Sequence, residues 1–478
     1  MRRLSGTDAL FLAGETPAWH QHVAGLSIID PRGVAGFSYE AVVRSIGERL
    51  PLIPKLTWKL REVPLGLHRA VWVPDPDFDV RRHVRRIGVA VPGGPHETAE
   101  TVGQILSTQL DRRHPLWEIW YIDGVVNGRV GLLMKYHHCL LDGVAGSGMA
   151  ALLFDFEPSP TKQPIRPLPP PEPEPNDAWF FVQAVVSSLS APCRLARYGA
   201  RLARRGIDTV GYAVSQHPKP DVSAMLQAPR TSFNHSIGAR RSMAFTSVAL
   251  RDVKALREHY DVKINDVVLA LCSGALRNYL DGRRELPRRT LTAGVPVSTR
   301  VEGDASLDNQ ISYIVVPLAT DVDDPTERLF AIHRHTVAAK ELRAAMGVHS
   351  VGSIGETAPP WMLAAAMRIA YASHLLSYVP GMMNTIVSNV PGPTYPLYLA
   401  GARLTGIFSA SVILEGMGLN MTIFSFADRV DFGIHVDPDL VPRPWDLAAG
   451  VHGALTELMT AADLGAPTSV EDAFGLQS

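Results

Sequence analysis

The sequence has few cysteines and no excess of charge of either sign. Only Cys139, Cys193 and Cys272 occur among the 478 residues, far apart and with no C-x-x-C pair. This excludes a disulfide framework and fits a reducing compartment. Lysine and arginine together number 46 and the acidic residues 47, which gives a net charge of −1. Because nucleic-acid binding usually requires a basic face, this balance argues against nucleic acid as a partner.

Long apolar runs are also missing. The N-terminal stretch "MRRLSGTDALFLAGETP" holds two arginines but no apolar run of the length that a signal peptide needs. Nowhere do about 18 apolar residues follow one another, so we expect no membrane-spanning helix. We expect a cytoplasmic protein, with peripheral attachment to the inner membrane face or to lipid inclusions left open.

Length and proline content indicate two domains. A chain of 478 residues is too long for one ordinary hydrophobic core. Prolines crowd the stretch Glu157–Asp177, where they exclude a regular helix and predict an extended connector. We therefore expect an N-terminal domain (residues 1–157), a connector with a basic helix (158–219) and a C-terminal domain (220–478). Both domains mix strand and helix patterns, which predicts an α/β fold with mixed sheets.

One predicted hairpin ends in a pair of histidines. The stretch "LWEIWYIDGVVNGRVGLLMKYHH" has two apolar runs joined by Asn127-Gly128, a strong hairpin turn signal. Alternation along the second strand places His138 on one face with Tyr136, and His137 on the other face with Lys135. Only one of the two imidazoles is therefore expected to face a given cavity.

In the C-terminal domain, residues 248–280 predict two helices, the second starting at Asn265 or Asp266 as an N-cap. The stretches 291–300 and 384–393 predict short buried strands followed by loops. Residues 419–437 predict a hairpin.

The histidine pair belongs to the stretch "KYHHCLLDGVAG", which contains the pattern H-H-x-x-x-D-G. An imidazole accepts a proton near neutral pH, since its ordinary pKa is about 6.5, so His138 is a candidate general base. Asp142 would orient this base directly or hold the loop by pairing with an arginine. Gly143 permits a tight turn.

The motif fits a metal site or a nucleophile less well. Adjacent histidines are often incidental, and on a strand they diverge. With no H-E-x-x-H pattern and no cysteine cluster, we expect no metal. Cys139 as a nucleophile beside His138 remains an alternative, while a G-x-S-x-G nucleophile elbow is absent.

The motif resembles the signature of the coenzyme A-dependent acyltransferase superfamily, which includes chloramphenicol acetyltransferase and peptide-synthetase condensation domains. Further stretches resemble the bacterial wax ester synthase/diacylglycerol acyltransferase family, in its actinobacterial triacylglycerol synthase branch. They run in order from residue 1 to about residue 445: "MRRLSGTDALFLAGETP", "VPLGLHRAVWVPDPDFDVRRHVR", "HPLWEIWYIDG", "INDVVLALCSGALRNYL", "GVPVSTR", "NTIVSNVPGP" and "GLNMTIFSFADRVDFGIHVDPDLVP".

The resemblance implies two related chloramphenicol-acetyltransferase-like domains, with an active-site tunnel at their interface. It implies an enzyme that uses acyl-CoA as a substrate, with no cofactor, and diacylglycerol or a long-chain alcohol as the acceptor. His138 would take the proton of the alcohol and return it to the departing thiolate. A condensation domain is the rival enzyme, and a lipid- or acyl-CoA-binding protein without turnover is the rival of another class.

The resemblance also assigns expected roles to single residues. His137 is expected to be structural, and Asp142 to hold the motif loop, with Arg300 as its partner. Eight further residues are expected to line the substrate or coenzyme tunnel, with ordinary packing or helix capping as the alternative: Pro115, Leu116, Trp117, Asn265, Asp266, Asn389, Pro391 and Gly392.

Two segments are candidates for contact with lipid. Five arginines recur at roughly helical spacing, which suits an anionic membrane surface or a solvated interdomain helix. They are Arg194, Arg197, Arg201, Arg204 and Arg205. Residues 359–383 are long, apolar and nearly uncharged, which suits core packing, an acyl channel or interfacial insertion. The sequence does not specify an oligomeric state.

Overall fold

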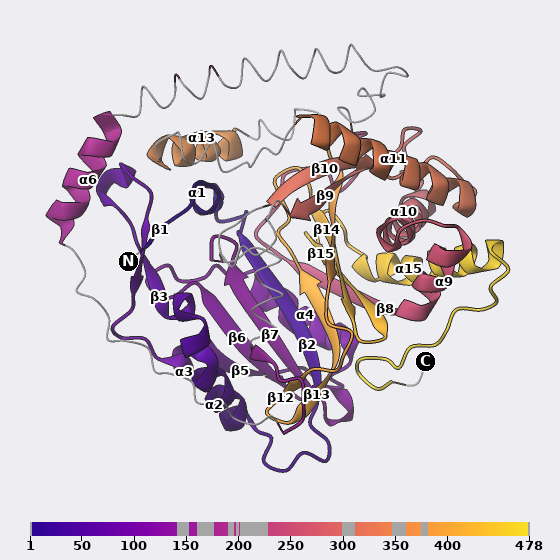
Figure 1. Cartoon of the computed structure of the whole chain (residues 1–478), viewed down its shortest axis with the longest axis horizontal. Coiled ribbons are helices and arrows are strands. Elements are labelled where there is room, and N and C mark those ends of the chain that lie inside the picture. Colours follow the sequence, from indigo (N-terminus) through magenta and orange to yellow (C-terminus); the bar gives the residue numbers. More distant parts are fainter. Residues whose placement is uncertain are drawn as a thin grey trace.

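The computed structural model describes residues 2–140, 153–159, 176–189, 228–298, 311–346, 360–373 and 381–476, together with residues 196 and 200. Over these residues the chain forms two six-stranded sheets that stand side by side (Figure 1). A smaller sheet has the order β1 (Arg2–Arg3), β4 (Val71–Pro74) and β3 (Trp58–Arg61).

The first large sheet has the order β12 (Tyr398–Leu399), β13 (Ala402–Ala410), β2 (His22–Asp30), β7 (Val130–His137), β6 (Trp117–Asp123) and β5 (Val84–Gly88). Its strands pair antiparallel, except β5 and β6, which are parallel. Strand β7 lies inside the sheet, so the strand that ends in the histidine pair is held on both edges.

The second large sheet has the order β10 (Ile311–Pro317), β9 (Thr292–Ser298), β11 (Thr385–Pro391), β14 (Leu419–Phe426), β15 (Arg429–Val436) and β8 (Ser242–Ala249). Strand β11 is parallel to both of its neighbours, and the other pairs are antiparallel. The prediction of mixed sheets is therefore confirmed, as are the strands and the hairpin expected in this half.

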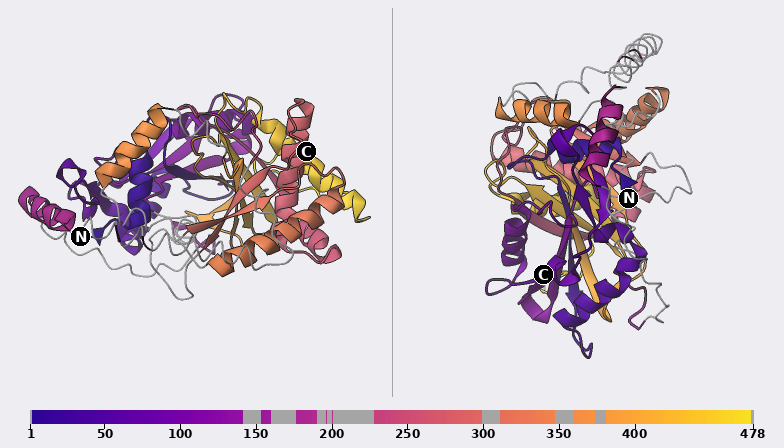
Figure 2. Two further views of the ribbon diagram at one scale, coloured as in Figure 1. Left: turned by 90° about the horizontal axis from the view of Figure 1, so that it is seen from above. Right: turned by 90° about the vertical axis from the view of Figure 1, so that its left-hand side faces the viewer.

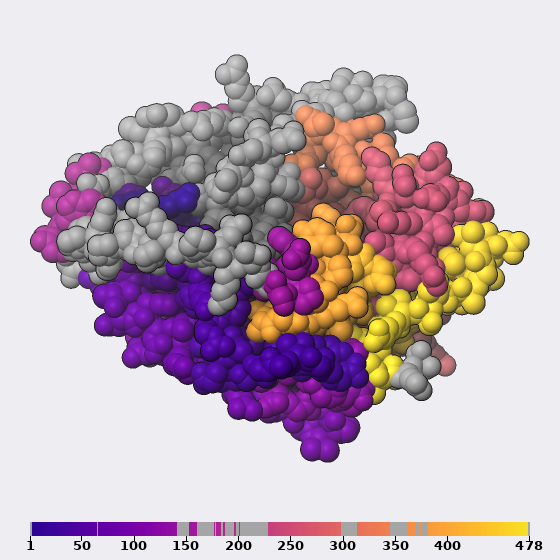
Figure 3. Space-filling model, turned by 60° about the horizontal axis from the view of Figure 1, so that its bottom comes forward, coloured from indigo at the N-terminus to yellow at the C-terminus, as the bar shows by residue number. Residues whose placement is uncertain are grey.

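The two sheets exchange chain segments. Strands β12 and β13 come late in the sequence but join the first sheet, where Phe408 pairs with Leu26 of β2. Figure 3 shows this orange segment against the indigo N-terminal segment on one face of the molecule. The domain boundaries at residues 157 and 220 remain a prediction, but the first sheet contains strands from both sides of them.

The hairpin between β6 and β7 forms where Asn127-Gly128 predicts it, but its loop spans residues 124–129 and contains the turn Val126–Gly128, so it is longer than a two-residue turn. Asn127 and Gly128 both have positive φ values, 60° and 67°, which is the backbone that Asn-Gly adopts without strain. Along β7, Leu132 and Tyr136 pack into one core cluster and Leu133 into another. Consecutive side chains of β7 thus point to opposite faces, as the alternation predicts.

Helices cover both sheets (Figure 2). Beside the first sheet lie α1 (Gly6–Gly14), α2 (Tyr39–Arg49), α3 (Val80–His83) and α4 (Pro95–Leu106), with the short turns η1 (Leu50–Leu52), η2 (Pro54–Thr57) and η4 (Val126–Gly128). Helix α6 (Asp177–Leu189) contacts η3 (Pro64–Gly66) and packs on the small sheet through Phe180. Beside the second lie α9 (Leu250–His259), α10 (Ile264–Gly282), α11 (Pro325–Met346) and α15 (Pro444–Ala461). Helix α13 (Pro360–Ala372) packs on α1 instead. None of the helices that the structure describes is long and apolar enough to cross a bilayer.

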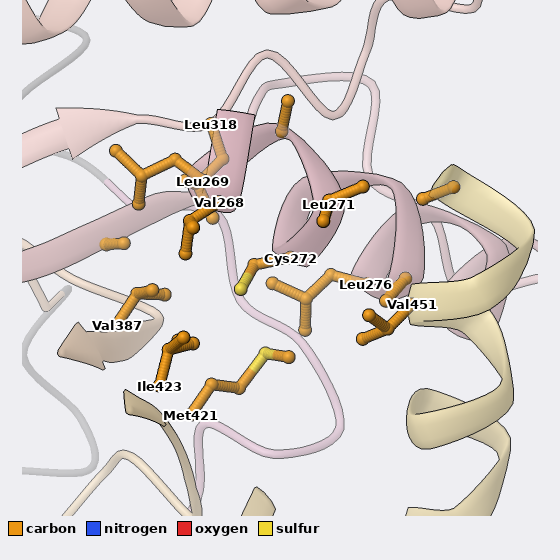
Figure 4. Close-up of a cluster of buried hydrophobic side chains, with 14 of the residues drawn as sticks. Val268, Leu269, Leu271, Cys272, Leu276, Leu318, Val387, Met421, Ile423 and Val451 are labelled. Atoms are coloured by element: carbon orange, nitrogen blue, oxygen red, sulfur yellow. The ribbon is translucent and has the colours of Figure 1, made fainter. Parts of the chain in front are cut away.

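The core of the second half is built around α10. Figure 4 shows its apolar side chains facing Val387 and Ile423 of the sheet on one side and Val451 of α15 on the other. Gly274 of α10 makes the contact with α15 possible, because a Cβ there would lie 2.6 Å from the Cβ of Ala454. This close packing fixes α10, whose first turn carries two of the predicted site residues.

The first turn of α10 differs from the sequence prediction. The helix begins at Ile264 with Lys263 as its N-cap, so the expected N-cap at Asn265 or Asp266 was wrong. The physical reason is that Asp266 caps the helix from inside. Its Oδ2 accepts a hydrogen bond of 3.1 Å from the backbone N–H of Lys263.

Candidate active site

The histidine pair stands where β7 ends in a tight turn. His137 is the last residue of β7 and is fully buried, and His138 follows it with 3% of its surface exposed. The backbone N–H of His138 donates to the Gln21 carbonyl at 2.7 Å, and that of Leu140 donates to the His137 carbonyl at 2.8 Å. These bonds fix where the backbone of His138 lies.

The ring of His138 lies flat on an aromatic ring of α1. The centroids of Phe11 and His138 are 4.0 Å apart, with 12° between the ring planes. Helix α1 is itself fixed at its start, because the Ser5 hydroxyl accepts the backbone N–H of Asp8 at 3.1 Å. The stacking restricts the plane of the His138 imidazole.

The ring of His137 has different partners. Its Nδ1 accepts a hydrogen bond of 3.1 Å from the backbone N–H of Cys139. Its Nε2 lies 3.7 Å from Oε2 of Glu15, which directly follows α1. The two adjacent imidazoles therefore have different partners. The imidazole of His137 accepts a backbone N–H and lies near a carboxylate, and the imidazole of His138 is stacked on Phe11.

Glu15 is a functional candidate that the sequence reasoning missed. Its side chain is 3% exposed, and Oε2 accepts two bonds from Arg112, at 2.6 Å from Nη2 and 2.9 Å from Nε. Burial alone would raise the pKa of Glu15, but the imidazoles of His137 and His22 and the charge of Arg112 together hold it far below its ordinary value. Glu15 is therefore a buried carboxylate. The available signal was its place in the N-terminal "GETP" stretch.

His22 completes this polar cluster. It pairs with His137 across β2 and β7, and its Nε2 lies 3.4 Å from Oε1 of Glu15 and accepts the Leu110 N–H at 3.3 Å. Burial is the main reason that the pKa of His22 falls to about 3, so this imidazole is neutral at physiological pH.

A cavity of about 640 Å³ adjoins Glu15. Leu12 and Ala13 of α1 and Trp361 and Ala364 of α13 are among its lining residues. Glu15 also lines it, and so do the charged residues Arg69, Arg112 and Arg368. A lining that mixes apolar and charged side chains suits an aliphatic ligand with a polar group.

Cys139 does not suit the role of a nucleophile. It is fully buried, and this burial raises the pKa of its thiol well above the ordinary value. A thiol in that state supplies almost no thiolate at neutral pH. The alternative in which Cys139 forms an acyl-enzyme therefore loses its support.

Three expected site residues, Asp142, Gly143 and Arg300, lie outside the described residues, and so does the run of arginines from Arg194 to Arg205. The proposed pairing of Asp142 with Arg300 remains a prediction.

The "PLW" element packs directly behind the motif. The carbonyl of Leu116 accepts the backbone N–H of His137 at 3.0 Å, and Trp117 Nε1 donates to the Leu56 carbonyl at 2.6 Å. Leu116 and Trp117 are buried, while Pro115 borders a separate surface pocket of about 440 Å³. Through these contacts the PLW element supports the end of β7. This agrees with ordinary packing, which was one of the two roles expected for these residues.

The remaining predicted residues gather in the second half. Asn389 of β11 donates from Nδ2 to Oδ1 of Asn265 at 3.3 Å, so two separate stretches meet there. Asp266 is turned toward α11, where its carboxylate contacts His333 Nδ1 at 2.7 Å and accepts the Thr336 hydroxyl at 2.8 Å. Asp266 thus caps α10 and ties it to α11.

The end of β11 needs a residue without a side chain. Pro391 is the last residue of the strand, and the N–H of Gly392 donates to the Ser425 hydroxyl at 3.2 Å. A Cβ on Gly392 would lie 2.3 Å from the Ser425 carbonyl oxygen. This loop is therefore packed tightly onto β14.

Family comparisons match almost the whole chain. The catalytic-domain model of the wax ester synthase/diacylglycerol acyltransferase family matches residues 4–268, and its C-terminal-domain model matches residues 307–459. This chain belongs to the wax ester synthase/diacylglycerol acyltransferase family. The sequence motifs had predicted this membership, and it is confirmed.

Individual relatives agree with the family match. Two Mycobacterium tuberculosis proteins provisionally named diacylglycerol O-acyltransferases are similar to this chain. One is 34% identical over 466 residues, covering 97% of this chain and 91% of the relative. The other is 32% identical over 487 residues, covering 100% of both.

Solved structures support the fold. The wax ester synthase/diacylglycerol acyltransferase of Marinobacter aquaeolei is 28% identical, with a TM-score of 0.69 over 96% of this chain and 100% of the other. The first condensation domain of the calcium-dependent antibiotic synthetase is 13% identical, with a TM-score of 0.58 over 96% of each chain. It shares the fold, and the predicted α/β class of the superfamily is confirmed.

Proposed function

We propose that this protein transfers a fatty acyl group from acyl-CoA to the free hydroxyl of diacylglycerol, giving triacylglycerol and coenzyme A. The observation that carries this proposal is His138, held at the end of β7 by the Gln21 carbonyl and by the ring of Phe11, in a chain of this family. The provisional names of the mycobacterial relatives support the choice of diacylglycerol as acceptor.

The chemistry needs one positioned base and no covalent enzyme intermediate. His138 accepts the proton of the acceptor hydroxyl as its oxygen attacks the thioester carbonyl carbon. The carbon–sulfur bond then breaks, and His138 returns the proton to the departing thiolate. The proton is conserved within the cycle, so no cofactor is required. Asp142 and Gly143 are proposed to shape the loop that follows His138.

Long-chain alcohols are the second class of acceptor. The family name covers wax ester synthesis as well, and the cavity beside Glu15 has apolar lining residues that either kind of aliphatic acceptor would contact. A protein that binds acyl-CoA or lipid without turnover is the rival proposal.

An acceptor of this kind lies in a lipid phase, and we propose that the protein is cytoplasmic and attaches peripherally to a membrane or a lipid inclusion through α6 and α13. Both helices contact η3. Phe180 anchors α6 in the protein, while its neighbours stay exposed. The exposed apolar side chains of the two helices are Trp179, Phe181, Val182, Val185, Val186, Trp361, Met362 and Ile369. Exposed apolar side chains of this number suit insertion into a lipid interface.

The test is release of coenzyme A thiol from palmitoyl-CoA with diacylglycerol, a long-chain alcohol or no acceptor. We expect acceptor-dependent release that falls by about 10²–10⁴-fold in His138→Ala. Replacement of the exposed His259 by alanine is the control and should leave the rate unchanged. Binding of acyl-CoA without acceptor-dependent release would favour the rival. Unchanged release in His138→Ala would remove His138 from the reaction.

A further inference from the structure

We infer that Glu15 is a positioning residue of this enzyme: its carboxylate holds the imidazole of His137, and His137 holds the turn that carries His138. The inference rests on the proposed role of His138 as the base. It assigns a task to a buried carboxylate that the acyl-transfer chemistry itself does not use.

The tautomer of His137 follows from its two partners. Because Nδ1 accepts the N–H of Cys139, the ring proton of a neutral His137 is on Nε2. This N–H faces Oε2 of Glu15 at 3.7 Å. The separation is longer than a hydrogen bond, so the attraction is electrostatic. With side-chain exposures of 1% and 3%, water screens it little.

The turn depends on the orientation of this ring. Three bonds meet at His137: its N–H donates to Leu116, its carbonyl accepts from Leu140, and its Nδ1 accepts from Cys139. If the ring flipped, the N–H of Cys139 would lose its acceptor, and the segment 137–140 would keep only its backbone bonds. His138 is inside that segment, so we infer that its imidazole would be held less firmly against Phe11.

Arg112 keeps Glu15 in place. Two of its N–H groups donate to Oε2 of Glu15, and a third nitrogen lies 3.4 Å from Oε1 of Glu62. The side chain of Glu62 is 65% exposed, whereas that of Glu15 is buried against both His137 and His22. Glu15 and Glu62 therefore contact the same arginine, and Glu62 can serve as the matched control for Glu15.

The experiment compares Glu15→Gln, Glu15→Asp and the control Glu62→Gln in the full chain. We expect Glu15→Gln to lower kcat about 10–100-fold with KM for palmitoyl-CoA nearly unchanged, as for loss of a group that orients a histidine. Glu15→Asp keeps the charge and should recover part of kcat, and Glu62→Gln should match wild type. Equal kcat values in wild type and Glu15→Gln, or equal losses in Glu15→Gln and Glu62→Gln, would overturn the inference.

A second readout does not need turnover. In ¹⁵N-histidine spectra, with His137→Gln used for assignment, wild type should show a single His137 tautomer with the proton on Nε2. Glu15→Gln should show a mixture of tautomers, and Glu62→Gln should not. If Glu15→Gln keeps the single tautomer, Glu15 does not position His137, whatever its effect on the rate. Because this readout is independent of acyl transfer, it separates failure of the inference from failure of the proposed function.

Discussion

The guanidinium of Arg241 donates a hydrogen bond to the carbonyl of Ala18, across the boundary between the two halves of the molecule. Arg241 precedes β8 of the second sheet, and Ala18 lies in the loop whose Gln21 carbonyl holds the N–H of His138. The backbone N–H of Arg241 also donates to the Ser107 hydroxyl at 2.8 Å. The second half thus secures the loop that holds the proposed base.

Replacing this arginine should therefore affect both stability and catalysis. Burial lowers the pKa of Arg241 to about 10, so it stays charged at neutral pH. In Arg241→Met the carbonyl of Ala18 loses its donor, at a cost of about 1–3 kcal/mol. We expect a lower melting temperature and a lower kcat. Arg240→Met is the control, because that side chain is exposed and pairs with the exposed Asp439; an equal effect of both changes would contradict the prediction.

Stability should fall as the pH drops below about 6.5. The folded-state pKa values of His22 and His435 are lowered to about 3, chiefly by burial. Between these values and about 6.5 the unfolded chain binds protons that the folded chain does not, so each group costs up to about 1.4 kcal/mol per pH unit. Chemical denaturation at pH 7, 6 and 5 should show this slope. His22→Gln should flatten it, whereas a slope identical to wild type would show that His22 does not contribute.

Gly392→Ala should destabilise the loop after β11. The new Cβ would lie 2.3 Å from the Ser425 carbonyl oxygen, and overpacking of this kind costs about 1–3 kcal/mol. We expect a lower melting temperature. Gly88→Ala in β5 is the matched control, because no atom of the described part of the chain lies within 4 Å of a Cβ there. Equal melting temperatures of the two variants would contradict the prediction, because they would show that the loop has room for the added methyl group.

Attachment to lipid should depend on apolar side chains of α6 and α13. Phe181→Ser and Trp361→Ser each remove a half-exposed aromatic ring, and each should weaken binding to phosphatidylcholine vesicles roughly fivefold, or about 1 kcal/mol. Leu52→Ser on η1 removes an equally exposed apolar side chain and should leave binding unchanged. Co-sedimentation with vesicles measures the effect. Identical binding of all three variants would place the lipid contact elsewhere.

Local chemistry made some features predictable. Asn127-Gly128 marks the position of the hairpin loop through its backbone preference, and the alternation along β7 determines which side chains share a face. The motif around His138 was recognisable because its residues are close in sequence. The start of α10 was misplaced because Asp266 caps from the third position of the helix, and residue type alone does not distinguish the two capping positions.

Contacts between distant segments were not predictable in this way. Glu15 and His137 meet only because α1 and β7 end at the same place, and nothing near either residue in the sequence signals the other. The contact between Asn265 and Asn389 was not predictable from local sequence either. The resemblance assigned both residues to the tunnel, but they meet only because α10 packs on β11. Pairing of β13 with β2 likewise has no local signal.

That last pairing has a consequence for synthesis on the ribosome. Strand β2 is made among the first 30 residues, but its neighbour β13 ends at Ala410. While the intervening chain is being translated, one edge of β2 has unpaired N–H and carbonyl groups that can bind other strands. The nascent N-terminal half can therefore associate incorrectly until almost the whole polypeptide has been made. Chaperones that bind it during this interval should raise the yield of native protein.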